Sequence, residues 1–268
     1  MDWFVGALLS LLVTTCSYYL SFLTKGGAIA VYVVGWLIFS LGKMTFSLPI
    51  LIFFISSNIF SRLGKSQKSQ LKNYYPQKNT RDVGQIMANG IFPILFLLGW
   101  SHFHHPMWIL LFFSSLAGAA ADTWATEIGV LSKQNPRSLL NFRTVQKGIS
   151  GGVSVLGEIA AILGAFLIAA VGICITRLET KIIFSWKHLV LVTFAGFVSQ
   201  IFDSILGAAL QVKYQCSECH QITERKTHCK SALTEKISGI RWVNNDLVNF
   251  LSIGCGIGTA WLTLKTIN

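Results

Sequence analysis

Apolar residues fill the chain in long runs that short polar segments interrupt. A helix needs about 20 apolar residues to cross a hydrocarbon core of about 30 Å, and most of the runs approach that length. The pattern therefore predicts an all-α fold, a polytopic transmembrane helical bundle of seven or eight spans. The expected spans cover residues 3–23, 28–42, 46–61, 86–101, 107–131, 152–176, 187–211 and 246–264.

The number of spans depends on the second and third runs, which are short and separated only by Gly42 to Phe46. They form either two spans or one broken or re-entrant element. The first run follows Asp2 and has neither a basic start nor a small-residue cleavage motif, so we interpret it as a retained span. We treat residues 1–268 as a single integral-membrane domain.

Composition supports this prediction. Hydrophobic residues make up 52% of the chain and charged residues 12%, whereas a soluble domain carries about 25% charged residues. Too few charged side chains are present to cover a globule of this size, so much of the surface must face lipid.

Basic residues concentrate in three polar segments, 62–85, 132–150 and 213–241. Two expected spans separate each segment from the next, so all three should emerge on one face of the membrane. The intervening loops, 102–106 and 177–186, contain few basic residues. By the positive-inside rule the basic face is cytoplasmic. The net charge of +11 thus reflects topology, and we expect no nucleic-acid partner.

Acidic residues inside spans cost roughly 2.5–3.5 kcal/mol each at the bilayer centre and usually mark functional positions. Asp122 and Glu127 lie near the cytoplasmic end of one span, with Thr123 and Thr126 between them. Carboxylates and hydroxyls together suit Mg²⁺ that is bound jointly with phosphate oxygens. The alternative interpretation is a helix end where the acids simply meet water.

A polar stripe crosses the span expected at 187–211. Its members recur at offsets of three and four, so they must face protein or a cavity instead of lipid. They form either part of a polar site or a hydrogen-bonded seam between helices. The stripe consists of Gln200, Asp203, Ser204, Gly207 and Gln211.

The last span opens with Asn244, Asn245 and Asp246, and Asn249 lies one turn beyond Asn245. Helix capping explains one Asn or Asp at such a position. It explains four together poorly, so we include this group among the candidate site residues.

Cations and glycines accompany these acids on the same face. Arg137 and Lys147 precede Gly148, Gly151 and Gly152, which lead into a span. Glycines before a helix N-terminus let backbone N–H groups approach an anion, and the helix dipole assists. Contact with anionic lipid headgroups is the alternative for the cations. Similar combinations occur around Arg62, Lys65, Arg81 and Asn89.

The third basic segment contains a CxxC pair, Cys216 and Cys219, followed by His228 and Cys229. A structural zinc site takes four ligands, here three Cys with His220 or His228. No second CxxC completes the motif, so zinc binding and four unliganded side chains both stay open.

Four of these motifs, in this order, resemble one known family. Together they span roughly residues 25–260 and are similar to a membrane-protein family that includes the plant phytyl-phosphate kinase of tocopherol synthesis and human transmembrane protein 19. The most specific run is Asp-Thr-Trp-Ala-Thr-Glu at 122–127, and the chain departs from the pattern at Asp82, Ile149 and Gln200. The motifs are Asp122–Gly129, Pro136-Arg137 with Gly148 and Gly151-Gly152, Asp203–Ala208, and Asn244–Asn249.

The resemblance implies phosphoryl transfer from a nucleoside triphosphate, in the first place CTP, to a prenyl monophosphate in the membrane. Asp122, Glu127 and Asp203 would then hold Mg²⁺, with Asp246 as a further catalytic candidate. The glycine loop with Arg137 and Lys147 would bind the transferred phosphate, and Arg62, Lys65 and Arg81 the acceptor phosphate. Further candidate phosphate-binding residues are Asn89, Thr123, Thr126, Ser204, Asn245 and Asn249.

Two other functions compete with this one. A transporter of an anionic lipid or small anion would use broken helices, as the region 28–61 permits. A CDP-alcohol phosphotransferase would need a dense aspartate motif that the chain lacks. Turnover that depends on CTP and Mg²⁺ would separate the kinase from the transporter.

Overall fold

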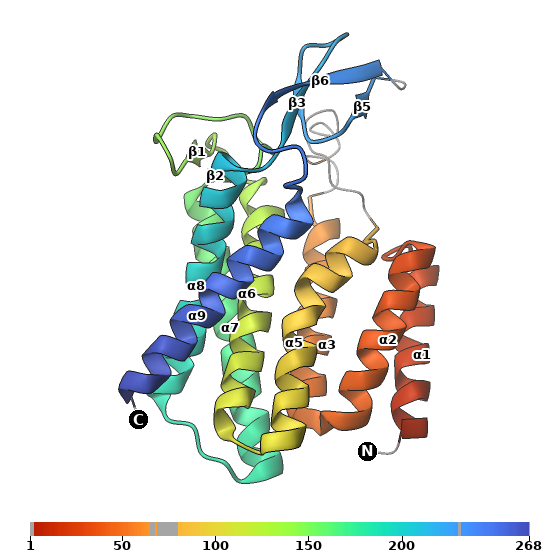
Figure 1. The fold of residues 1–268 in the computed structure, drawn as a ribbon, viewed down its shortest axis with the longest axis vertical. Helices are drawn as coiled ribbons and strands as arrows, with labels where there is room; N and C mark the ends of the chain where they lie inside the picture. The colour runs from red at the N-terminus through yellow and green to blue at the C-terminus, as the bar shows by residue number, and fades with distance from the viewer. Residues whose placement is uncertain (1–2, 65–67, 69–79, 230–231, 268) are drawn as a thin grey trace.

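The computed structural model describes residues 3–64, 68, 80–229 and 232–267, and it forms a bundle of helices with β-structure at one end (Figure 1). Lys65, one of the predicted phosphate-binding residues, lies outside the described residues. The helices are α1 (Trp3–Tyr19), α2 (Lys25–Leu41), α3 (Lys43–Arg62), α5 (Val83–Phe103), α6 (Pro106–Gly129), α7 (Val155–Thr180), α8 (Trp186–Ala209) and α9 (Asn245–Ile267).

The predicted helical membrane bundle is confirmed. Among the described helices, six are long and apolar enough to cross a bilayer, and α1 and α2 are apolar helices of 17 residues each. Consecutive helices run in alternating directions, so the described parts of the three basic segments lie at one end of the bundle, and the start of α1 and the end of α9 lie at the other (Figure 1). This is the arrangement that the charge pattern predicted.

The short second and third runs form two separate helices, not one broken span. The chain reverses between α2 and α3 at Gly42 and Lys43, and Lys43 has a left-handed φ of 48°. The Glu179 carboxylate, at the end of α7, accepts hydrogen bonds from the N–H groups of Met44 (3.0 Å) and Thr45 (2.7 Å). An acidic group at this position satisfies the open N-terminus of α3 and fixes the reversal.

Helix α6 forms the centre of the bundle and packs against α3, α5, α7, α8 and α9. Every residue from Ile109 to Ala121 is buried. Small residues allow this close packing: a Cβ added to Gly196 of α8 would lie 2.8 Å from the Cβ atoms of Ala117 and Ala165. The central helix therefore holds its polar C-terminal turns, 122–129, in a fixed position relative to α7 and α8.

The second and third basic segments contain β-structure that the hydrophobic pattern did not predict. In the second, β1 (Arg137–Ser138) pairs antiparallel with β2 (Gly152–Val153), which closes the segment into a loop before α7. In the third, a sheet of order β4-β3-β6-β5 stands above the bundle (Figure 1). Its strands are β3 (Lys213–Cys216), β4 (Ile222–Thr223), β5 (Thr227–His228) and β6 (Ala232–Ser238).

Candidate active site

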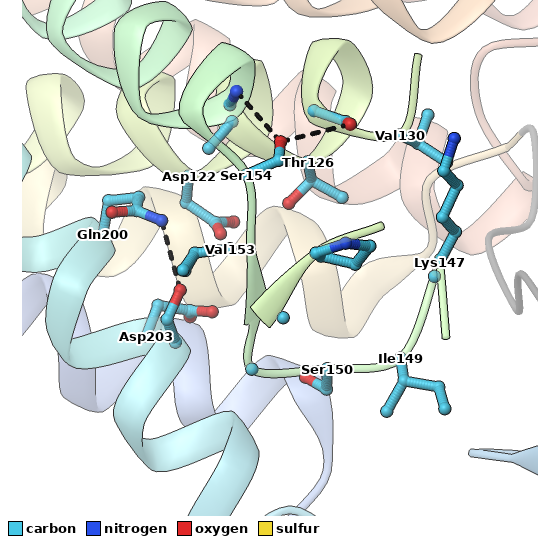
Figure 2. Close-up of a pocket in the computed structure, with 18 of the residues that line it drawn as sticks. Asp122, Thr126, Val130, Lys147, Ile149, Ser150, Val153, Ser154, Gln200 and Asp203 are labelled. Carbon is cyan, nitrogen blue, oxygen red and sulfur yellow. Dashed lines mark hydrogen bonds between the residues drawn. The ribbon is translucent and has the colours of Figure 1, made fainter. Parts of the chain in front are cut away.

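A pocket of about 830 Å³, including its open mouth, lies where α6, α7 and α8 meet the loop before α7. Asp122 and Thr126 of α6 line one side, and Asp203 and Ser204 of α8 line another. Figure 2 shows Asp122 and Asp203 directed toward the same space, with the loop around Ser150 closing it. Two parts of the chain that were predicted to act together thus share one pocket.

The glycine loop, residues 147–152, forms a wall of this pocket. Gly148 and Gly151 adopt left-handed φ values of 85° and 84°, which glycine adopts without strain. A Cβ on Gly151 would lie 2.5 Å from the backbone nitrogen of Ala208, so the loop also rests directly on α8. In the described part of the chain, the N–H groups of Gly148 and Gly151 make no backbone hydrogen bond. The loop therefore supplies donors beside the start of α7, as an anion site requires.

Hydrogen bonds to residues near the ends of α6, α7 and α8 fix this loop. Ser150 donates to Gln211 Oε1 over 2.7 Å. Gln211 was predicted as the last member of the helical polar stripe, but it lies beyond the end of α8 at Ala209 and pairs with Ile240 in a β-bridge. Ser154 caps α7 by accepting from the N–H of Gly157 (3.2 Å) and donates to the Gly129 carbonyl (3.3 Å), as Figure 2 shows. Lys147 donates to the Ser132 carbonyl and also lines the pocket.

The carboxyl groups of Asp122 and Asp203 lie within hydrogen-bonding reach of each other across the pocket. Ser252 donates to Asp203 Oδ2 (3.3 Å), and Asn249, with its amide oriented as a donor, lies 2.8 Å from the same oxygen. Two carboxyl groups approach this closely when they share a proton or a cation. The acids thus form a centre to which α6, α8 and α9 all contribute.

A cation would also satisfy two atoms that lack partners. Glu158 Oε2 and Gln200 Oε1 are buried acceptors that find no hydrogen-bond partner among the described residues, although Gln200 Nε2 donates to Glu158 Oε1 (3.1 Å) and Ser204 Oγ (3.1 Å). Both residues line the pocket with Asp122 and Asp203. A set of carboxylate and amide oxygens with open acceptor sites fits Mg²⁺ and its bound waters.

Glu224, which follows β4, completes the wall of the pocket from the sheet side. Its carboxylate accepts hydrogen bonds from the Ser150 N–H and the Gln211 side chain. Burial raises the pKa of Glu224 to about 7, and the nearby Lys213 ammonium opposes this increase. Burial in turn lowers the pKa of Lys213. Glu224 is thus a carboxyl group that changes charge near neutral pH inside the site.

A second pocket of about 640 Å³ lies between α1, α2, α3 and α5. Its walls are apolar, including Val34, Phe53 and Leu116, and Gln85 and Asn89 give it a polar margin. Arg81 lies at this margin, before α5, with its guanidinium 5.8 Å from the ring centroid of Phe53.

The charge of Arg81 is poorly compensated. Burial lowers the pKa of its guanidinium, and Glu127 raises it. Within the described ranges, no carboxylate lies within 4.0 Å of this group. A half-buried cation next to an apolar cavity suits an anionic headgroup with an apolar tail.

Glu127, which was predicted to hold Mg²⁺ with Asp122 and Asp203, lines neither pocket. It is buried and forms an ion pair with Lys68, whose Nζ lies 2.5 Å from Glu127 Oε2. It interacts electrostatically with Asp122 of the first pocket and with Arg81 of the second. The charge of Glu127 therefore acts on one group in each pocket.

Comparison with known proteins places the chain in a family. The profile described as "Integral membrane protein DUF92" matches residues 8–257. An uncharacterized membrane protein of Methanocaldococcus jannaschii is 31% identical over 193 residues, which are 71% of this chain and 76% of that protein. The chain belongs to the DUF92 family of integral membrane proteins.

Two plant proteins are also similar to this chain. Protein PGR of Arabidopsis thaliana is 28% identical over 92% of this chain and 91% of its own length. The chloroplastic protein VTE6 of Arabidopsis thaliana is 25% identical over 54% of this chain and 34% of its own length. No solved structure matches the chain.

Most of the predicted site residues of this DUF92 protein fall at the two pockets. The first pocket is lined by Asp122, Thr126, Lys147, Gly148, Gly151, Gly152, Asp203, Ser204 and Asn245, and Asn249 contacts it through Asp203. Arg81 and Asn89 line the second pocket. Asn244 caps α9 by accepting from the Leu247 N–H (3.0 Å), so capping and site residues coexist in that motif.

Besides Glu127 and Asn249, four further predicted residues among those described line neither pocket. Arg62 donates to the Leu20 carbonyl and its guanidinium lies 4.0 Å from the Phe22 ring centroid, so it fastens the α1–α2 connection. Thr123 donates to the Ala119 carbonyl of its own helix (2.8 Å). Arg137 is exposed in β1, and the Asp246 carboxylate packs against Gly84 at the start of α5.

Sequence reasoning did not include Glu158, Glu224 or Lys68 among the site residues. Glu158 could have been found, because it is an acid within an otherwise apolar span. Glu224 and Lys68 carry no such signal, since acids and lysines are ordinary in polar loops. Only the tertiary structure brings Glu224 to the pocket and Lys68 to Glu127.

Proposed function

We propose that this protein is a membrane-bound kinase that transfers a phosphoryl group from a nucleoside triphosphate to a prenyl monophosphate, giving the diphosphate. The proposal rests on the pairing of two different pockets. One pocket is polar, with four carboxyl groups and a glycine loop, and the other is apolar with Arg81 at its margin. A polyphosphate suits the first, and an apolar chain that ends in a phosphate suits the second.

The nucleotide phosphates would bind at the glycine loop. The N–H groups of Gly148 and Gly151, the start of α7 and Lys147 would contact the triphosphate. Lys147 would neutralise charge on the transferred group. The triphosphate is negatively charged and the pocket contains four carboxyl groups, so a cation must lie between them for the nucleotide to bind.

Asp122, Asp203, Glu158 and Gln200 would hold one or two Mg²⁺ ions with the triphosphate. Bound Mg²⁺ supplies charge neutralisation for phosphoryl transfer. Ser252 and Asn249 hold the Asp203 carboxyl group in place, and Asp203 in turn contacts Asp122. These positioning bonds keep the acids aimed at one point in a half-buried setting.

The acceptor would lie in the second pocket, with its prenyl chain between α1, α2, α3 and α5. Arg81 and Asn89 would hold the acceptor phosphate. Glu127 and Lys68, which form an ion pair, would set the charge balance between donor and acceptor. An acceptor phosphate is already a competent nucleophile, so positioning takes the place of a general base.

The likeness of the motifs at 122–127, 148–152, 203–208 and 244–249 to phytyl-phosphate kinase supports the prenyl acceptor and CTP as the donor. Membership of the DUF92 family extends over all four motifs. The basic end of the bundle would face the cytoplasm, where nucleoside triphosphates are available.

The test compares variants of the two pockets in purified protein with Mg²⁺, CTP and a prenyl monophosphate. Arg81→Met should raise KM for the lipid phosphate and leave nucleotide affinity unchanged. Asp203→Asn should abolish turnover and weaken Mg²⁺-dependent nucleotide binding. Thr123→Val, which removes a hydroxyl outside the pockets, is the matched control. If both pocket variants keep wild-type kinetics, or if the wild type turns over no nucleotide with any prenyl phosphate, the proposed function is wrong.

A further inference from the structure

The cysteine-containing turn and strand above the bundle bring four metal-binding side chains together. The ligand atoms of Cys216, Cys219, His228 and Cys229 all lie within 4.8 Å of one another. His228 Nδ1 lies 3.4 Å from Cys219 Sγ and 3.2 Å from Cys229 Sγ. A tetrahedral Zn²⁺ with bonds of 2.0–2.3 Å separates its ligand atoms by about 3.5–3.8 Å. The cluster is therefore already close to the size of such a site.

The backbone of the two turns is shaped around the sulfur atoms. The N–H groups of Glu218 and Cys219 are hydrogen-bonded to the Cys216 sulfur, as partners of a metal-bound thiolate are. His220 and Cys229 adopt left-handed φ values of 55° and 37°. Neither is a glycine, so the surrounding structure must hold each turn in place.

The strands that carry these ligands have little apolar core of their own. Leu233 and Ile237 of β6 are 75% and 46% exposed. The strands are two to seven residues long. Small units of this kind commonly depend on a disulfide or a metal for their stability. All three cysteines of the cluster are free, so a metal is the remaining crosslink.

We infer that Cys216, Cys219, His228 and Cys229 bind one structural Zn²⁺ that fastens the β3–β6 sheet over the glycine-loop pocket. Three cysteines and one histidine are a closed structural set for zinc. The ion would join the end of β3 to the end of β5, strands that flank β6 in the sheet. His220 is exposed and outside the cluster, so the choice between the two histidines falls on His228.

The fastened sheet would position a residue of the pocket. Glu224 directly follows β4, which pairs with β3, and its carboxylate accepts from the Ser150 N–H of the glycine loop. Without the ion, the turn after β3 and the end of β5 are no longer joined. Zinc thus acts as a positioning element at a distance from the acids, and this role is separate from the phosphoryl transfer proposed above.

The experiment measures metal content in the full chain, purified in detergent under reducing conditions without a metal-affinity column. We expect elemental mass spectrometry to find one zinc ion per chain. Cys219→Ser and His228→Ala should each lose it. His220→Ala and Cys255→Ser, which change a neighbouring histidine and a cysteine of α9, should each retain it.

A second set of measurements uses wild-type protein, so that its result does not depend on whether the variants fold. Wild-type protein in which Co²⁺ replaces the ion should show the absorption of tetrahedral cobalt with thiolate ligands. Chelation should accelerate tryptic cleavage within 213–241 and leave the helices intact. Wild type without zinc, zinc retained in both ligand variants, or a Cys216–Cys219 disulfide in the reduced preparation would each overturn the inference. None of these results depends on kinase activity.

Discussion

Gly151 is the residue at which a single methyl group should disturb the proposed nucleotide site most directly. Its φ of 84° is left-handed, and for an L-residue such a conformation costs about 1–2 kcal/mol. An added Cβ would also lie 2.4–2.6 Å from three atoms of Ala208, two of them backbone. To reach an ordinary contact of 3.4 Å, the loop and α8 must separate by about 0.8–1.0 Å.

Gly151→Ala should therefore displace the loop from α8. Loss of one hydrogen bond from its N–H groups to a charged phosphate costs about 1.5–3 kcal/mol, or roughly 10- to 150-fold in affinity. The assay is equilibrium binding of a labelled nucleotide with Mg²⁺, together with thermal unfolding of the same samples. Gly258→Ala is the control, because a Cβ there meets nothing within 4 Å. Unchanged nucleotide affinity in a folded Gly151→Ala protein would refute the assignment of the loop.

Three further predictions follow from single contacts. Lys68→Met removes the partner of buried Glu127 and should lower the free energy of unfolding by about 3–5 kcal/mol, while adding Glu127→Gln should recover most of it in denaturant titrations. Because the pKa of Glu224 is raised to about 7, its extra negative charge, beside Asp203 and opposite Lys213, appears as pH rises through 7. As pH rises through 7, nucleotide affinity should fall in the wild type and stay constant in Glu224→Gln. The free energy of unfolding of the wild type should decrease as pH rises from about 4.5 to 7, because only the folded state keeps the Glu224 proton in that interval. Glu179→Ala should lower stability by about 1–2 kcal/mol through the lost cap of α3, with unchanged turnover, since it lies away from both pockets; a loss of activity at equal folding would contradict this.

Hydropathy and charge were sufficient to predict the helical bundle and the common face of the three basic segments. Both follow from the cost of exposing polar groups to lipid, which acts on each span separately. The polar stripe of α8 was also predictable, because Asp203 and Gln200 can only face protein in such a helix. These parts of the fold depend on local sequence.

The remaining parts depend on contacts between distant segments. Glu224 reaches the pocket only because a small sheet forms above it, and short strands of mixed polarity leave no periodic signal. Arg62 has the composition of a phosphate-binding residue but packs on Phe22. A basic residue in a loop can serve either purpose, and only the tertiary structure separates the two.

The most direct test of the central proposal follows the γ-phosphate of a labelled nucleoside triphosphate. Purified wild-type protein with Mg²⁺ would be incubated with labelled CTP, ATP, GTP or UTP and with phytyl or geranylgeranyl monophosphate, beside the Asp122→Asn variant. The proposal predicts labelled prenyl diphosphate in the wild type, most with CTP, and none in the variant. Folded wild-type protein that leaves the label in the nucleotide with every acceptor would contradict it and favour a transporter.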